Sequence, residues 1–279
     1  MESDQPIGNG AWDGIPLPAG TLNGVGVVGI GSLYARDDGG TVQPDGGAAA
    51  VSVIAVRSGA GGFAASRVGM DRCGRDIVDS LRAAGVDVQA IQTDPDLVTP
   101  RWIARGASVR LEPYAAFDTI QWDAEIEALA RSAEIIVTDA CGRRHGQSRS
   151  SIDRMLIAAT NAVRIIDLTR RPPSEGHRLD REHVGQALEL CDVFVVDPTA
   201  LRTLVPAAGD ALDAARRLHD LRRRGAVAIV PTPSNEGCVV SQRGIERIAA
   251  RPASGARVAM AVGCAMVVGR APHELVATL

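Results

Sequence analysis

One glycine pattern near the N-terminus has the spacing of a dinucleotide site. Residues 24–29 read Gly-Val-Gly-Val-Val-Gly, and such glycines bind a pyrophosphate when they follow a strand and open a helix. Here they lie inside an apolar run, and Ser32–Arg36 leads into a Gly-rich turn rather than a helix. The pattern therefore predicts a strand, Val25–Ile30, and no Rossmann-type site.

An aspartate that could accept a proton stands in the string Ala208–Leu212. Asp210 follows a glycine there and precedes the segment Ala211–Arg223. In that segment leucine and alanine recur at helical spacing and arginines fall between them, which is typical of a surface helix. Because aspartate is a preferred helix N-cap, we expect Asp210 to cap this helix and not to act as a catalytic base.

The cysteines give no sign of a metal centre. None of them forms a CxxC motif or a Cys/His cluster with zinc spacing. Scattered cysteines in odd number are typical of reduced thiols in a cytoplasmic protein. The five are Cys73, Cys141, Cys191, Cys238 and Cys264. The sequence thus predicts no metal ligand.

Short β-branched runs alternate with amphipathic segments along most of the chain. This alternation is typical of an α/β fold with a mostly parallel sheet. The predicted strands are Val25–Ile30, Gly62–Val68, Ile135–Thr138, Arg164–Leu168, Val193–Val196 and Val227–Val230. The predicted helices are Gly74–Ala84, Ala124–Arg131, Ser151–Ala162, His183–Leu190 and Ala211–Arg223.

The chain divides into an arm, one domain and an insertion within it. Residues 1–23 are rich in Gly and Pro and lack periodicity, so we expect a flexible arm before a domain of residues 24–279. Residues 91–122 combine turn residues with short strands, Trp102–Ala104 and Ser108–Leu111. This stretch predicts a small β-rich lid over one edge of the sheet.

The composition excludes several classes of partner. Hydrophobic residues make up 46% of the chain and charged residues 23%, as in ordinary globular proteins. The net charge of −3 gives no electrostatic attraction to nucleic acid. No apolar run approaches the ~20 residues of a membrane span, and early acidic residues do not fit a signal peptide. We expect a cytoplasmic protein.

A set of ordered landmarks runs from Val25 to the end of the chain. A Gly46-Gly47 pair precedes an Ala/Val-rich helix. Further landmark strings follow in order: Ser66–Arg75, Leu81–Asp87, Phe117–Asp123, Gly142–Arg144, Asp167–Pro172 and Cys191–Asp197. Their order and spacing resemble those of the PfkB carbohydrate kinases, in particular the fructokinase-like branch. The resemblance implies a ribokinase-like three-layer α/β/α domain with a mostly parallel central sheet and a small β-rich lid.

The resemblance also implies ATP-dependent phosphorylation of a sugar hydroxyl, with Mg²⁺ as a second cofactor. In the family an Asp in a Gly-Ala-Gly-Asp loop takes the hydroxyl proton, and glycine amides at a helix N-terminus stabilise phosphate charge. In this chain Ser254, Gly255 and Ala256 fall at that loop, and Arg257 takes the position of the base. An alignment shifted by one residue places Ala256 there instead. Arginine cannot accept a proton near neutral pH, so no catalytic set is intact.

Further family positions agree with this loss. The sugar-binding Asp after the first strand corresponds to Arg36, and the Asn after the Gly-Gly pair falls at Val51 or its neighbour. The Glu of an Asn-x-x-Glu motif, which helps to organise magnesium, is absent from Asp197–Ala200. The Thr-x-Gly motif that contacts ATP phosphates appears as Thr232-Pro233-Ser234, with Gly237 retained after it.

The candidate site residues fall into two groups. Those for an anion or a nucleotide are Ser254, Gly255, Arg257, Thr232 and Gly237. Those for a substrate pocket are Arg36, Gly46, Gly47, Asp167 and Arg171, of which Asp167 and Arg171 match polar positions of the family.

Three hypotheses follow for the function. The residues favour a kinase homologue that has lost phosphoryl transfer and acts as a binding or regulatory protein, paired through its lid with itself or with an active relative. A second hypothesis is an ATP-dependent sugar or nucleoside kinase that uses other catalytic residues. In the third, Arg36 and Arg257 make a repurposed pocket for an anionic ligand, because arginine binds phosphate and carboxylate in bidentate fashion.

Overall fold

The short β-branched runs of the sequence form one large central sheet. The structure, a computed structural model, describes residues 23–37, 42–105, 108–110, 114–169, 181–222, 225–230, 237–248 and 254–269. The sheet has nine strands in the order β13-β12-β11-β10-β9-β8-β1-β4-β5 and is parallel except for β12 and β13. The strands are β1 (Gly26–Ile30), β4 (Gly61–Gly69), β5 (Ile91–Asp94), β8 (Ile135–Asp139), β9 (Val163–Asp167), β10 (Val193–Val196), β11 (Ala226–Ile229), β12 (Gly237–Ser241) and β13 (Gly244–Ile248).

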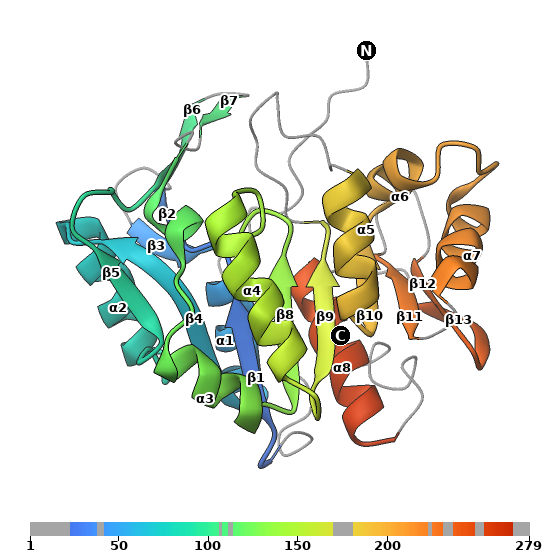
Figure 1. The fold of residues 1–279 in the computed structure, drawn as a ribbon, viewed down its shortest axis with the longest axis horizontal. Coiled ribbons are helices and arrows are strands. Elements are labelled where there is room, and N and C mark those ends of the chain that lie inside the picture. The colour runs from blue at the N-terminus through green and yellow to red at the C-terminus, as the bar shows by residue number, and fades with distance from the viewer. Residues whose placement is uncertain are drawn as a thin grey trace.

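Helices cover both faces of this sheet, because its central strands are apolar on both sides. One face carries α1 (Gly47–Arg57), α2 (Arg72–Ala83) and α8 (Gly255–Val267). The other carries α3 (Ala124–Ser132), α4 (Gly146–Ala158), α5 (Arg181–Leu190), α6 (Pro198–Leu204) and α7 (Ala211–Arg222). Figure 1 shows this second set in front of the sheet. The three-layer α/β/α architecture that the sequence predicts is confirmed.

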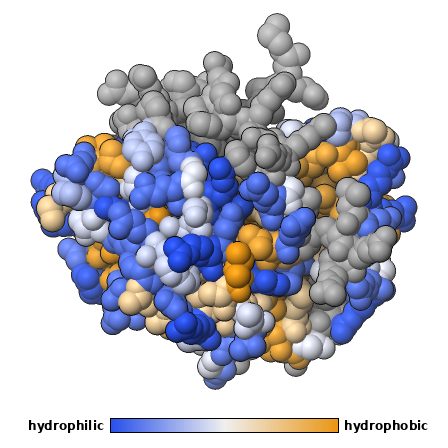
Figure 2. Space-filling view, viewed as in Figure 1, coloured by the Kyte–Doolittle hydropathy of each residue, from blue (hydrophilic) through white to orange (hydrophobic). Residues whose placement is uncertain are grey.

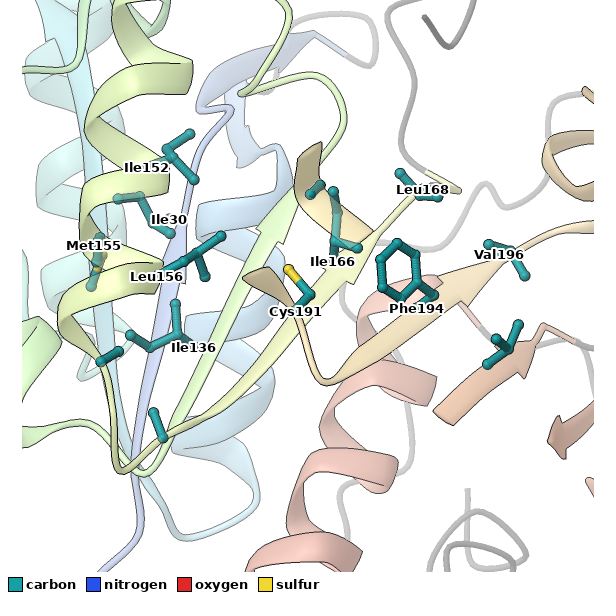
Figure 3. Packing of buried hydrophobic residues seen from close by; sticks show 14 of the residues in the cluster. Ile30, Ile136, Ile152, Met155, Leu156, Ile166, Leu168, Cys191, Phe194 and Val196 are labelled. Carbon is teal, nitrogen blue, oxygen red and sulfur yellow. The ribbon is translucent and has the colours of Figure 1, made fainter. Parts of the chain in front are cut away.

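The core lies between these layers. On the face covered by α4, Ile152, Met155 and Leu156 lie beside Ile30 and Ile136 of the sheet (Figure 3). Burial of each such side chain contributes roughly 1.5–3 kcal/mol to folding. This packing fixes the strand ends, and with them any site at the edge of the sheet.

A small four-stranded sheet lies beyond one end of the large one. Its order is β3-β2-β6-β7, and its strands are β2 (Tyr34–Asp37), β3 (Val42–Asp45), β6 (Arg101–Arg105) and β7 (Ser108–Arg110). The predicted lid segment, residues 91–122, therefore supplies only two of the four strands. Its first part, β5, pairs with β4 in the large sheet, and its last part forms the short 3₁₀-helix η1 (Ala116–Thr119).

The sequence prediction missed several elements. It left out the hairpin β12–β13, the helix α6 and the strands β2 and β3. The predicted arm, residues 1–23, lies almost entirely outside the described residues. Of the glycines in the GxGxxG pattern, Gly26 begins β1 and Gly29 lies within it, as the sequence predicts, whereas Gly24 lies in the turn before the strand.

The molecular surface is mostly hydrophilic on the face of α3, α4 and α5, with scattered apolar spots (Figure 2). Ile157 of α4 is one exposed apolar residue of this layer. Among the described residues, no helix combines the length and the apolarity that crossing a membrane requires.

Candidate functional site at the carboxyl edge of the sheet

The strand order reverses between β1 and β8. From β1 the chain passes through α1 to β4 on one side, whereas from β8 it passes through α4 to β9 on the other. In open α/β sheets, ligands bind outside the carboxyl ends of the strands at such a switch point. Figure 1 shows β8 and β9 pointing toward the end of the molecule from which β6 and β7 extend. This edge is the candidate site.

A buried aspartate, Asp139, joins the two sides of the switch point. It ends β8 and is fully buried. Its carboxylate accepts hydrogen bonds from the hydroxyl and the N–H of Ser32, which follows β1, and from the N–H of Gly142. It also accepts one from the N–H of Gly47, at 2.8 Å, in the first turn of α1. Asp139 therefore ties β1, α1 and the loop after β8 together.

The glycines around Asp139 are required by close packing. A Cβ atom at Gly47 would overlap the Asp139 carboxylate, and one at Gly142 would overlap the backbone of Gly31. Gly46 has a φ of +110°, which L side chains rarely adopt. The Gly46-Gly47 pair thus allows α1 to begin directly against Ser32 and Asp139.

A second buried aspartate, Asp167, ends β9. It is 2% exposed, and its Oδ1 accepts hydrogen bonds from the N–H of Thr169 at 2.9 Å and its hydroxyl at 2.6 Å. Gly255, the first residue of α8, lies directly against it: a Cβ there would overlap the carboxylate of Asp167 and the hydroxyl of Thr169. Asp167 therefore lies at the N-terminus of α8.

The two aspartates are neighbours. Asp139 and Asp167 are directly paired in the parallel register of β8 and β9. Asp139 contacts α1 and Asp167 contacts α8, and these two helices pack side by side on one face of the sheet. Adjacent parallel strands lie about 4.8 Å apart. Two carboxylates thus stand next to each other beneath two helix N-termini.

The first turn of α8 presents Arg257. Ser254 is the N-cap, and its side chain accepts a hydrogen bond from the N–H of Arg257 at 3.4 Å. The Arg257 side chain is half-buried, and this burial lowers the pKa of its guanidinium below the ordinary value. Ser254, Gly255 and Arg257 therefore belong to one helix start, and Gly255 places this start against Asp167.

One face of the small sheet is directed toward this edge. Tyr34 stacks on Trp102 with ring centroids 5.6 Å apart, and both pack against Phe117 and Cys141 of the main domain. Arg36 lies two residues after Tyr34 in the same strand and pairs in register with Trp102. Since side chains alternate along a strand, Arg36 belongs to this inner face. It forms an ion pair of 4.0 Å with Asp45.

A buried ion pair anchors the segment that follows the small sheet. Asp118 of η1 is fully buried, and Arg144, after β8, donates to it from Nε at 2.8 Å and from Nη2. The Arg144 guanidinium also lies over the ring of Phe117, 4.8 Å from its centroid. This pair fixes η1 against the carboxyl end of β8.

The other predicted positions lie apart from this cluster or outside the described residues. Gly237 is the first residue of β12, near the far edge of the sheet. Thr232 and Arg171 fall outside the described residues. Asp197 caps α6 through the N–H of Ala200, and Asp210 accepts a hydrogen bond from the N–H of Asp213 in the first turn of α7.

Sequence reasoning missed Ser32, Asp139 and Asp118. A signal for Asp139 was present, because it directly follows the β-branched run of the predicted strand Ile135–Thr138. A polar residue at the carboxyl end of a central parallel strand is a ligand-site candidate. In the part of the chain that the structure describes, no group of three or more His, Cys, Asp or Glu side chains could hold a metal ion.

These features define an α/β/α protein whose candidate site lies where two helices begin at the carboxyl edge of the sheet. Comparison with known protein families identifies the family of this chain. The profile of the pfkB family carbohydrate kinases matches residues 35–256. The chain belongs to the pfkB family of carbohydrate kinases.

Solved structures show the same fold at low sequence identity. A PfkB protein from Polaromonas sp. JS666 is 18% identical with a TM-score of 0.75, and the match covers 92% of each chain. The fructokinase of Halothermothrix orenii is 16% identical with a TM-score of 0.73, covering 90% of this chain and 96% of that one. The aminoimidazole riboside kinase of Salmonella enterica is 17% identical with a TM-score of 0.71, covering 90% and 89%. No curated protein sequence matches the chain significantly.

Proposed function

We propose that this chain binds a small sugar-like ligand at the carboxyl edge of its sheet and has lost the phosphoryl transfer of its family. It would then serve as a binding or regulatory protein. The observation that carries this proposal is Arg257 in the first turn of α8, where the family resemblance calls for an aspartate. A sugar hydroxyl must lose its proton to attack a phosphate, and a guanidinium cannot take that proton.

Burial does not change this argument. Desolvation lowers the pKa of Arg257, but arginine starts from a pKa above ~12 and stays protonated in proteins near neutral pH. A permanent cation at the start of α8 favours an anion instead, since the helix N-terminus carries partial positive charge as well.

The fold supports binding of a sugar-like ligand. The aminoimidazole riboside kinase structure is a complex with aminoimidazole riboside and an ATP analog, and a related Vibrio cholerae fructokinase structure holds fructose and ADP. By analogy, the ligand of this chain is a sugar or a nucleoside. Arg36, on the inner face of the small sheet, favours forms with a carboxylate or a phosphate group.

One observation favours a second function, an active sugar or nucleoside kinase. Asp167 lies against the first residue of α8, so a carboxylate is present near the position of the lost base. If the chain is an active kinase, Asp167 is the group that would accept the hydroxyl proton.

Two measurements test the first proposal against the second. Calorimetry with ribose, fructose, gluconate and fructose 6-phosphate, each with and without ATP–Mg²⁺, measures binding. A coupled assay measures ADP release in the presence of the same compounds. We expect binding of at least one compound and no sugar-dependent ADP release. Release at ordinary kinase rates of about 1–100 s⁻¹ would contradict the loss of phosphoryl transfer.

A further inference from the structure

We propose that Asp71, the N-cap of α2, is a positioning residue of the candidate site: it binds the segment that leads into β6 and thereby holds the small sheet in place at the carboxyl edge. Asp71 acts through the small sheet and does not contact the ligand. Its effect on ligand affinity rests on the proposed function, whereas its effect on the small sheet is a property of the ligand-free chain.

The two faces of β2 show why the position of the small sheet matters. Ala35 is fully buried and belongs to the same apolar cluster as Cys73 and Ile77 of α2, and α2 packs against both β2 and β3. Tyr34 and Arg36, on either side of Ala35, lie on the opposite face, which is directed toward the candidate site. A shift of β2 relative to α2 would therefore move the site-facing side chains of the same strand.

Asp71 attaches the base of the small sheet to the start of α2. One oxygen of its carboxylate accepts the N–H of Gly74 and so caps the helix, and the other accepts the N–H of Thr99, both at 2.7 Å. Pro100, the next residue, accepts the N–H of Ala35 in β2 at 2.9 Å. The chain then enters β6. One carboxylate thus connects α2 to the point where β2 and β6 meet.

The charge of Asp71 contributes to this attachment. Arg101, the first residue of β6, interacts through its guanidinium with the thiol of Cys73 and attracts the Asp71 carboxylate. Asparagine is as good an N-cap as aspartate, but it is uncharged and has a single acceptor oxygen in place of two. Asp71→Asn therefore keeps the cap of α2 and weakens the link to Thr99 and Arg101.

Amide hydrogen exchange of the ligand-free chain tests the link. In Asp71→Asn the amides of β2 and β6 should exchange roughly 5-fold faster, the change that one typical hydrogen bond makes in an equilibrium constant. Asp210→Ala is the control, because Asp210 caps α7 through the N–H of Asp213 in the same helix. This control lowers overall stability and should leave the exchange of the small sheet unchanged. Exchange in the small sheet that rises no more in Asp71→Asn than in Asp210→Ala would overturn the proposal.

Calorimetric titration with fructose, gluconate and fructose 6-phosphate relates the position of the small sheet to binding. Each probe that the wild-type chain binds should bind Asp71→Asn roughly 5-fold more weakly and Asp210→Ala with unchanged affinity. Equal affinity in Asp71→Asn would show that the small sheet does not contribute to the site, and the positioning role would fail. If the wild-type chain binds none of the three probes, the proposed function fails, while hydrogen exchange still decides whether Asp71 holds the small sheet.

A second pair of variants covers the case that Asp71→Asn does not fold. The Thr99 hydroxyl accepts the N–H of Gly69, at the end of β4, at 2.9 Å. Thr99→Val removes this acceptor and weakens the attachment of the same segment, whereas Thr99→Ser retains a hydroxyl. We expect faster exchange in β2 and β6 for the valine variant and no change for the serine variant. Equal exchange in these two variants would contradict the role of the segment that Asp71 binds.

Discussion

Gly255 and Arg257 show at the residue scale how one short loop combines a structural requirement with a chemical one. Gly255 must be glycine because the buried carboxylate of Asp167 and the hydroxyl of Thr169 occupy the space of a side chain. Arg257, two residues later, decides which chemistry the loop can support. The loop therefore starts a helix directly against a buried carboxylate, and it presents a cation at the position where the family resemblance predicts a proton acceptor.

Replacing Gly255 with alanine should destabilise the protein by about 2–3 kcal/mol, because the added methyl group would overlap buried polar atoms. Gly185→Ala is the control. Gly185 lies inside α5 with no atom within 4 Å of an added Cβ, so alanine should stabilise the protein by about 0.5–1 kcal/mol. Urea denaturation of both variants measures the difference. Equal stabilities would show that the α8 start is not packed against Asp167 as described.

Arg257→Asp restores the carboxylate of the family loop. We expect sugar-dependent ADP release to stay at background, because the Asp197–Ala200 segment still lacks the glutamate that the resemblance associates with magnesium. The same coupled assay, run beside the wild-type chain, measures this. Activity at an ordinary kinase rate in this single variant would mean that Arg257 alone blocks phosphoryl transfer.

At the scale of elements, aspartates cap the starts of several helices, and some of them also bind a second element of the fold. Asp71 caps α2 through the N–H of Gly74 at 2.7 Å, and its other oxygen accepts the N–H of Thr99, also at 2.7 Å. Thr99 in turn accepts the N–H of Gly69 at the end of β4. Asp71 therefore joins α2, the end of β4 and the segment that leads into the small sheet. Asp210 caps α7 through the N–H of Asp213, a residue of the same helix.

Asp71→Ala should cost about 2 kcal/mol of unfolding free energy, roughly 1 for the lost cap and 1 for the lost bond to Thr99. Asp210→Ala removes a cap on an exposed helix and should cost about 0.5–1 kcal/mol. Thermal and urea unfolding measure both values. Ligand binding should not change in Asp210→Ala. A loss of binding in this variant would indicate that Asp210 is a site residue, contrary to the prediction that it only caps α7.

At the scale of the whole molecule, the carboxylates of Asp71 and Asp94 should make stability depend on pH. Burial alone would raise the pKa of Asp94, but hydrogen bonds from the N–H groups of Asp96 and Leu97 and from the Thr119 hydroxyl, together with Arg67, lower it below the ordinary value. For Asp71, too, burial acts to raise the pKa, and the N–H groups of Thr99 and Gly74 outweigh it. Both carboxylates are thus more acidic in the folded state than in the unfolded chain.

A lowered pKa in the folded state means that the unfolded chain binds more protons at acid pH. Stability from Asp71 and Asp94 is therefore fully present above their ordinary pKa of about 3.9, and it is lost as the pH falls through the folded-state values. Urea midpoints measured from pH 7 down to pH 3 should fall at the acid end. In Asp94→Asn the midpoint should be lower at pH 7 and depend less on pH. A wild-type midpoint that does not fall toward pH 3 would contradict this assignment.

Local pattern in the sequence predicted most of the large sheet and its helices. The runs Ile135–Thr138 and Val193–Val196 are apolar and β-branched, and Ala211–Arg223 has helical periodicity. The structure places β8, β10 and α7 there. The hairpin β12–β13 and the strands β2 and β3 were missed, because short strands at a sheet edge lack a long apolar run and depend on their neighbours for pairing.

The sequence by itself determined that the loop at residues 254–257 carries no carboxylate, because that conclusion needs only the identities of Ser254, Gly255, Ala256 and Arg257. Tertiary structure alone decided that Asp139 and Asp167, 28 residues apart in the sequence, become neighbours. Register between two parallel strands depends on how the intervening helix packs, and local periodicity does not contain that information. The same holds for Gly255, whose contact with Asp167 arises only when α8 docks onto the sheet.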